Sequence, residues 1–324
     1  MIIKECVFIL PYFGKFNNYF TIFLKSCKTN PNYDWLIFTD CEDDYNFPDN
    51  VHKILITLED IKKIAEDKFG FSVCLKTPYK LCDYKPAYGY LFEEYIREYP
   101  YWGHCDCDLV FGNLEKLLTP LLKQGFDKLF AAGHLTIYKN TYENNRRFMK
   151  TFHNRILYRQ AYTTDTIFVM DEDCAGHDNV HTIFREDGTN IYETDLSVNP
   201  SISSAKFIRE YYEPTLHEFI KEDYIKARYF WIDGSIVRVE WNKTILKSEF
   251  LYLHLQMRRM RMKHNFESNM IEILPDRFVS VDKIPGTKSE MRLWQIGIFN
   301  LYWYDVFRKK IARKLNLMRN KLRL

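Results

Sequence analysis

Two aspartates, Asp106 and Asp108, carry the chemistry that is easiest to recognise in this sequence. An apolar, aromatic run leads into them from residue 101, and a second apolar run leads away to residue 112. At strand spacing, residues i and i+2 point to the same side, so both carboxylates could converge on one divalent cation. Oxygen ligands suit hard ions such as Mn²⁺ or Mg²⁺. An ion held at a sheet edge is suited to clamp a diphosphate.

The spacing of the two aspartates is weak evidence by itself. With 22 Asp in 324 residues, chance gives roughly one or two such triplets. The sequence contains two, and the second is Asp171-Glu172-Asp173. A pair of surface aspartates in a turn is the alternative. The setting favours a site at the first pair, because it lies in an apolar strand between Gly103 and Gly112.

Size and composition indicate a folded globular protein. The chain has 324 residues, of which 46% are apolar and 17% aromatic, with a net charge of +3. Its eight Cys include no Cys-x-x-Cys pair, and residues 1–5 lead directly into an apolar strand without a signal-peptide pattern. We therefore expect reduced thiols and a cytoplasmic protein.

The elements around the aspartates follow a βαβ pattern. An apolar strand at 6–10 is followed by a turn at 11–14, a helix at 17–28 and a strand at 35–40 that ends in Asp40. Further along we expect a strand at 54–56, helices at 58–69 and 86–98, a strand at 129–138, a helix at 144–152 and a loop-rich stretch at 160–200, then short strands at 228–241 and 250–255. This order predicts an α/β protein with ligands at the carboxyl ends of parallel strands.

These residues resemble the GT-A-fold glycosyltransferases over about residues 4–260. The resemblance rests on the βαβ unit, the Thr39-Asp40 strand end, the stretch 85–89 and the Asp106-Cys107-Asp108 strand. It extends to uncharacterised bacterial glycosyltransferase-like proteins of capsule and lipopolysaccharide clusters. The fold that it implies is a GT-A-like, Rossmann-type mixed sheet with flanking helices over residues 1–285, followed by a tail at 286–324.

The resemblance also implies a site. Pro11, Tyr12, Phe13 and Asp40 would hold the nucleotide, although Asp40 could equally be a loop carboxylate. Lys85 and Asp106 would meet the donor diphosphate, unless Lys85 is a solvated lysine at a helix end. His254 resembles a third metal ligand beside Asp106 and Asp108, and a core histidine is the alternative.

The resemblance implies transfer of a sugar from a nucleoside-diphosphate donor, with a UDP-sugar as the preferred donor, to a saccharide or lipid-linked acceptor, with Mn²⁺ or Mg²⁺ as cofactor. The preferred catalytic carboxylates are Asp171 and Glu172, where an apolar run delivers acids to the loop-rich side, and Asp195 is a weaker candidate. The sequence does not distinguish inversion from retention.

The last 17 residues carry eight basic side chains and no acidic one, so the rest of the chain sums to about −5. Apolar residues recur there at helical spacing, at positions 307, 311, 315, 318 and 322. This pattern predicts a basic amphipathic helix that lies on an anionic membrane, at the inner face of the cell membrane. A helix packed on the domain and a nucleic-acid contact are the other readings, and we expect no nucleic-acid partner.

Two other functional classes remain open. A metal-dependent nucleotidyltransferase or nucleotide-sugar hydrolase would use the same aspartates, although no Gly-rich phosphate loop supports it. A non-catalytic, membrane-associated carbohydrate-binding scaffold would retain the fold and bind no nucleotide in the presence of Mn²⁺.

Overall fold

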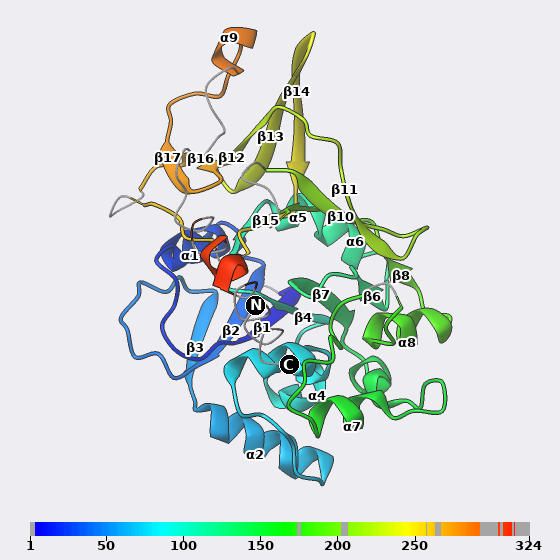
Figure 1. Cartoon of the computed structure of the whole chain (residues 1–324). Coiled ribbons are helices and arrows are strands. Elements are labelled where there is room, and N and C mark those ends of the chain that lie inside the picture. Colours follow the sequence, from blue (N-terminus) through cyan, green and yellow to red (C-terminus); the bar gives the residue numbers. More distant parts are fainter. Residues whose placement is uncertain are drawn as a thin grey trace.

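The structure, a computed structural model, describes residues 4–173, 176–201, 207–256, 258–262, 267–291, 304, 307–312 and 314. Its central sheet has the strand order β3-β2-β1-β4-β7-β6-β8 (Figure 1). These strands are β1 (Cys6–Pro11), β2 (Tyr33–Thr39), β3 (Val51–Leu55), β4 (Tyr101–Cys105), β6 (Lys128–Leu129), β7 (Leu135–Lys139) and β8 (Ile191–Tyr192). Strands β1 to β4 run parallel to one another, whereas β7 is antiparallel to β4.

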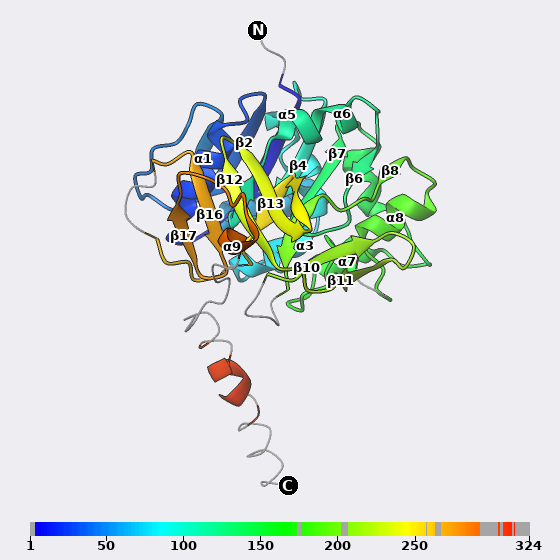
Figure 2. The ribbon, with the colours of Figure 1, turned by 90° about the horizontal axis from the view of Figure 1, so that it is seen from above.

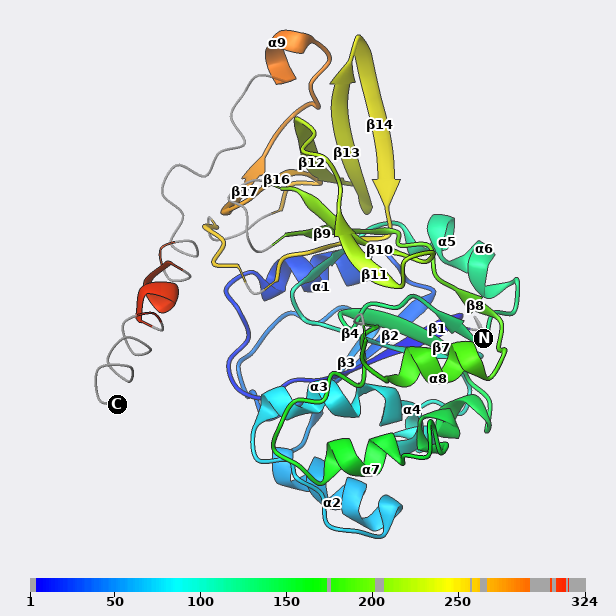
Figure 3. The ribbon, with the colours of Figure 1, turned by 45° about the vertical axis from the view of Figure 1, so that its right-hand side comes forward.

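Both faces of this sheet are buried, which explains why β1 and β2 read as nearly continuous apolar runs. In β1, Phe8 and Leu10 pack into one core cluster and Val7 and Ile9 into another. The first face is covered by α1 (Phe20–Lys28), α5 (Leu114–Leu117) and α6 (Thr119–Leu122). The second is covered by α2 (Leu58–Phe69), α3 (Leu81–Tyr84), α4 (Tyr88–Leu91), α7 (Leu157–Tyr162) and α8 (Val180–Glu186) (Figure 3).

Two antiparallel-rich sheets lie on the α1 side. The second sheet has the order β11-β10-β9-β15-β5, and the third has the order β14-β13-β12-β16-β17. Their strands are β5 (Leu109–Phe111), β9 (Ser197–Pro200), β10 (Arg209–Glu213), β11 (Glu218–Lys221), β12 (Ala227–Ile232), β13 (Ser235–Asn242), β14 (Thr244–Phe250), β15 (Tyr252–His254), β16 (Met270–Leu274) and β17 (Arg277–Ser280). Seen from above, the third sheet lies in front of α1 (Figure 2), and Ile22 of α1 and Tyr19, the residue just before it, pack into one core cluster with this sheet.

The local signals of the N-terminal half predict its elements well. The strand expected at 6–10, the helix at 17–28 and the strands at 35–40 and 54–56 correspond to β1, α1, β2 and β3. The expected bounds of α2 are correct, because Thr57 and Asp60 form a capping box at its start and Gly70 ends it in the left-handed conformation. The α/β class is therefore confirmed as a mixed α/β fold.

The prediction that Asp106 and Asp108 share one strand is wrong. Strand β4 ends at Cys105, the aspartates lie in the turn that follows, and β5 begins at Leu109 in a different sheet. The chain turns here because β4 pairs with β1 and β7, whereas β5 pairs with β15. The carboxylates therefore converge through a turn between two sheets.

Four other expectations differ from the structure. The helix expected at 86–98 consists of η2 (Lys85–Ala87), α4 and η3 (Glu93–Tyr95). The strand expected at 129–138 is interrupted between β6 and β7, where Phe130 has a φ of 71°. The helix expected at 144–152 is the 3₁₀ segment η4 (Asn144–Met149), and the loop-rich stretch 160–200 contains α8, β8 and β9.

Beyond β17, the structure describes α9 (Lys288–Met291) and a few residues of the tail. Residues 304, 307–312 and 314 are helical and exposed. The other apolar positions of the expected amphipathic pattern, 315, 318 and 322, lie outside the described residues. Within the described part of the chain, no helix is both long and apolar enough to cross a bilayer.

Candidate metal and nucleotide site

The candidate site lies where the connectivity of the central sheet reverses direction. From β1 the chain proceeds outward to β2 and β3, and then returns to place β4 on the other side of β1. Loops at the carboxyl ends of β1 and β4 therefore diverge and leave a crevice, which is where ligands bind in open α/β sheets. A cavity of about 400 Å³ lies there, and residues 10–13 and 105–108 line it.

Asp106, Asp108 and His254 converge at this cavity and could hold a metal ion. One ligand atom from each lies within 4.8 Å of the others. The His254 Nε2 atom is 3.4 Å from Asp108 Oδ1 and 4.0 Å from Asp106 Oδ2. The side chain of Asp108 is 2% exposed and that of His254 12% exposed. Two carboxylates and one imidazole form a donor set that fits Mn²⁺ or Mg²⁺.

Strand pairing explains why His254 reaches the aspartates. Strand β15 runs antiparallel to β5 with His254 opposite Leu109, and the Leu255 amide donates to the Asp108 carbonyl at 3.0 Å. This register places His254 beside Asp108 although the two residues are far apart in the sequence. A shift of one residue would turn the imidazole to the other face of the sheet.

The side chain of Asn199 orients the imidazole of His254. The Asn199 Oδ1 atom accepts from His254 Nδ1 at 3.1 Å and from Gln256 Nε2 at 2.7 Å. Because an amide oxygen only accepts, His254 carries its proton on Nδ1 and directs Nε2 towards the aspartates. Burial lowers the pKa of His254, but the charges of Asp108 and Asp106 outweigh burial and raise this pKa above its usual value.

Lys85 supplies a buried cation at the same cavity. Its Nζ atom lies 2.8 Å from Asp106 Oδ1 and 3.2 Å from Asp171 Oδ2, and it donates to the Gly133 carbonyl at 2.7 Å. Burial alone would lower the pKa of Lys85, but the two carboxylates raise it well above its usual value. The side chain is therefore held as an ammonium group between the candidate metal site and the acids at 171–173.

Asp171 and Glu172 are brought to the back of this site. The buried Asp171 is linked to Asp106 through Lys85, and it lies against Gly133, where an added Cβ would be 2.6 Å from Asp171 Oδ2. Burial raises the pKa of Asp171 in spite of Lys85. Burial, followed by the charge of Asp171, raises the pKa of Glu172 to about 7. Neither side chain lines the 400 Å³ cavity directly.

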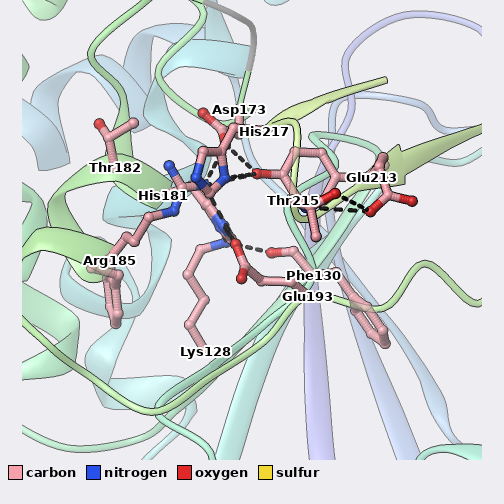
Figure 4. Close-up of polar contacts among 12 residues, drawn as sticks. Lys128, Phe130, Asp173, His181, Thr182, Arg185, Glu193, Glu213, Thr215 and His217 are labelled. Carbon is pink, nitrogen blue, oxygen red and sulfur yellow. Dashed lines mark hydrogen bonds and ion pairs between the residues drawn. The ribbon is translucent and has the colours of Figure 1, made fainter. Parts of the chain in front are cut away.

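The third acid of this stretch, Asp173, belongs to a buried network (Figure 4). Its carboxylate accepts from Arg185 and from the Tyr212 hydroxyl, both at 2.5 Å, and from Asn179 at 3.0 Å. Arg185 also pairs with Glu193, which accepts from His181 at 2.8 Å. The pKa of Asp173 is lowered, because these hydrogen bonds outweigh its burial. The acid stretch is therefore anchored at its far end and is not a solvated turn.

The Lys128 ammonium closes the network on the side of the central sheet. It contacts the Phe130 carbonyl and lies 2.8 Å from His181 Nδ1 (Figure 4). Burial lowers the pKa of Lys128 to about 7 and that of His181 to about 4. A neutral imidazole that accepts from Lys128 and donates to Glu193 satisfies all three side chains.

The remaining expected residues fall into two groups. Pro11, Tyr12 and Phe13 line the cavity, and burial, with the nearby Cys107 and Asp108, raises the pKa of Tyr12 to about 12. Asp40 is exposed and does not line the cavity; its carboxylate accepts from the Gly14 amide at 2.7 Å and closes the turn after β1.

Several cavity residues were not anticipated from the sequence. Pro78, Tyr79, Cys82, Tyr88 and Gln256 line it. Asn199, which accepts a hydrogen bond from His254, was not anticipated either, because it lies in the stretch 160–200 that we expected to be loop-rich. None carries a local sequence signal, because each reaches the site through tertiary packing. The cysteines offer no thiolate, since burial raises the pKa of Cys105 and Cys107 well above the usual value.

A protein-family model with the description "Family of unknown function (DUF6625)" matches residues 8–282, so the chain belongs to that family. A search of the curated proteins finds no match. Among solved structures, the galactosyltransferase LgtC in complex with donor and acceptor sugar analogues matches 60% of this chain and 76% of its own chain at 11% identity. The TM-score of this match is 0.33. That score is too low to establish a common fold.

Proposed function

We propose that the protein is a metal-dependent glycosyltransferase of the GT-A type, which moves a sugar from a nucleoside-diphosphate donor, UDP-sugar by preference, to a saccharide or lipid-linked acceptor. One observation carries this proposal. Asp106, Asp108 and His254 converge from separate elements at a 400 Å³ cavity, at the point where the strand order of the sheet reverses. A cavity of this size is within the usual range for small-molecule sites.

Each group at the cavity has a role in this reaction. Asp106, Asp108 and His254 would hold Mn²⁺ or Mg²⁺, which supplies neutralisation of the charge on the departing diphosphate. The Lys85 ammonium adds a second positive charge that is already in place before the substrate arrives. Tyr12 and Phe13 offer aromatic surface at the end of β1 for the nucleoside.

Glu172 is our candidate for proton chemistry. Its pKa of about 7 is close to the value at which a carboxylate accepts a proton most effectively near neutral pH. Asp171, which lies behind the cavity and pairs with Lys85, is our second candidate for a catalytic carboxylate. The Asp173 carboxylate, in contrast, already accepts hydrogen bonds from Arg185, Tyr212 and Asn179, and we assign it the role of supporting Asp171 and Glu172.

Calorimetry with UDP tests the binding half of the proposal. We expect UDP to bind in the presence of Mn²⁺ and to bind weakly or not at all without it. Asp108→Asn should abolish this metal-dependent binding, because it removes one anionic ligand. Asp276→Asn is the matched control, since Asp276 is equally buried at 1% exposure but lies between β16 and β17. Metal-independent UDP binding, or binding unaffected by Asp108→Asn, would contradict the proposal.

Product analysis tests the reaction. Incubation of a panel of nucleotide sugars with Mn²⁺, with and without saccharide acceptors, separates transfer from hydrolysis. Sugar transfer only in the presence of an acceptor supports a transferase. Release of free sugar at the same rate without an acceptor indicates a nucleotide-sugar hydrolase, and absence of both reactions indicates a binding protein.

We further propose that the acceptor belongs to cell-surface polysaccharide synthesis, capsule or lipopolysaccharide, and that the protein works in the cytoplasm at the inner face of the membrane. The support is the tail, with eight basic and no acidic residues among its last 17. A lipid-linked acceptor makes membrane docking useful, since both then share one surface.

A further inference from the structure

The segment that leads into Asp171 has an unusual backbone. Val169 has a φ of 58°, in the left-handed region that β-branched residues rarely adopt. Such a conformation persists only where surrounding contacts hold it. Val169 lies two residues before Asp171, so its conformation sets the direction from which the Asp171 side chain approaches the site.

Asp83 supplies contacts on both sides of Val169. Its carboxylate accepts from the Phe168 amide at 2.9 and 3.1 Å and from the Met170 amide at 3.2 Å. Asp83 is fully buried and belongs to α3, a helix far from this segment in the sequence. Two amide groups that flank one residue and point at one carboxylate define a bend at that residue, which is the left-handed bend observed at Val169.

Lys80 completes this arrangement. Its Nζ atom pairs with Asp83 Oδ2 at 2.7 Å and donates to the Thr166 carbonyl at 2.6 Å. Both side chains of the pair are at most 3% exposed. The Asp83 charge is therefore compensated inside the protein, and the segment is held at 166, 168 and 170 by two residues of the continuous helical stretch 78–84.

The next element along the chain, η2, reaches Asp171 itself. Lys85 directly follows α3, and its ammonium pairs with Asp171 Oδ2 at 3.2 Å and with Asp106. Asp83 thus holds the backbone before Asp171, while Lys85 holds its carboxylate. Beyond Asp171, the Asp173 amide donates to the Ala131 carbonyl at 3.0 Å. Contacts on both sides of Asp171 and Glu172 therefore fix the position of these two acids.

We propose that Asp83, neutralised by Lys80, is a positioning residue that sets the place of Asp171 and Glu172 relative to the candidate metal site. The inference rests on the proposed function for its catalytic consequence. Asp83 touches neither the cavity nor the metal ligands, so it affects turnover through the backbone at 168–170. Misplacement of a reacting group by about 1 Å can cost about 100-fold in rate.

The test compares Asp83→Asn and Asp83→Glu with the wild-type full chain. Asn lacks the charge that Lys80 needs and replaces one oxygen by an NH₂ group, which cannot accept from Lys80 or from the Phe168 amide as Asp83 Oδ2 does. Glu keeps the charge and moves the carboxylate by one methylene. We expect kcat to fall about 10- to 100-fold, with the KM for the donor and the affinity for Mn²⁺ and UDP changed less than about twofold. Hydrogen exchange at the Phe168 and Met170 amides should accelerate.

Glu272→Gln is the matched control. Glu272 is 6% exposed and forms a two-point ion pair with Arg228 at 2.6 and 2.6 Å in the third sheet, away from the cavity. It should lower the melting temperature as Asp83→Asn does, without lowering kcat in the temperature range where the variant is folded.

Three results would overturn the inference. Unchanged exchange at Phe168 and Met170 in both variants overturns the inference, and so does accelerated exchange with unchanged kcat. An equal loss of kcat in Glu272→Gln also overturns it, because the effect would then be general destabilisation. If the wild-type protein turns over no donor, the proposed function fails, while the exchange rates still decide whether Asp83 holds this segment.

Discussion

At the scale of single residues, the site is defined by how burial and charge act on a few side chains. Lys85 stays charged inside the protein because two carboxylates face it. Burial, followed by the charge of Asp171, raises the pKa of Glu172 to about 7. Asp106, Asp108, His254 and Lys85 were identified from residue types and resemblance, and the structure brings all four to one cavity. Their assignment to roles remains a prediction.

Gly133→Ala tests the packing against Asp171. The added methyl would lie 2.6 Å from Asp171 Oδ2 and 3.1 Å from its Cγ, so the carboxylate must move away from Lys85. We expect destabilisation of about 1–3 kcal/mol, measured by chemical denaturation, together with a loss of turnover. Gly286→Ala is the control, since its Cβ would meet nothing closer than 3.7 Å. Equal stability of the two variants would refute the close contact.

Glu172→Gln tests the shifted pKa of about 7. A carboxyl whose pKa is higher in the folded than in the unfolded state binds more protons when folded. Its contribution to stability is therefore greatest at low pH and declines as pH rises from about 4.5 to about 7. The decline should be at most about 3 kcal/mol. Without metal, the wild-type free energy of unfolding should fall more steeply than that of Glu172→Gln across this window; parallel curves would exclude the shift.

At the scale of elements, strand register assembles the candidate metal site. The pairing of β15 with β5 places His254 beside Asp108, and β9 contributes Asn199 to orient the imidazole. At this scale, one helix predicted from the local sequence is also shorter in the structure. The helix expected at 86–98 is interrupted at Phe92, whose φ of −112° and ψ of 26° are not helical. Before this break, α4 lies so close to the sheet that a Cβ at Gly89 would be 2.2 Å from Trp102.

Asn199→Ala tests this support of His254. Loss of the acceptor frees the imidazole to change tautomer and orientation, and we expect the affinity for Mn²⁺ to fall about 10- to 100-fold. Electron paramagnetic resonance titration of free Mn²⁺ measures it. Asn140→Ala is a suitable comparison, because it removes three side-chain hydrogen bonds, to the carbonyls of Ile96 and Tyr99 and from Asn145, but lies outside the cavity. Equal Mn²⁺ affinity of the two variants would count against the Asn199 role.

At the scale of the whole molecule, different observations support the candidate site and the proposed role of the basic tail. The folded part of the chain carries the candidate site. The proposed membrane role of the tail, in contrast, is supported by its composition and by the exposed helical residues 307–312. Its membrane role is a proposal that depends on charge, and so it can be tested without truncation.

A triple substitution of Lys309, Lys310 and Lys314 by Gln, in the full chain, tests that role. Each basic residue near an anionic surface contributes about 1 kcal/mol, so binding to vesicles with phosphatidylserine should weaken roughly 100-fold. Co-sedimentation measures this, with neutral phosphatidylcholine vesicles as the control. UDP binding should be unchanged. Equal binding of wild type and variant to both kinds of vesicle would disprove electrostatic docking.

The sequence by itself determined the early elements and the residues worth suspecting. Strands β1 and β2 and helix α2 depend on apolar periodicity, caps and breakers within a few residues, and these signals are local. Only the tertiary structure decided that a turn and not a strand presents Asp106 and Asp108, that His254 joins them, and that Asp83 holds the approach to Asp171. These contacts join residues far apart in the chain, and sheet register and side-chain packing, which no local pattern encodes, determine where they meet.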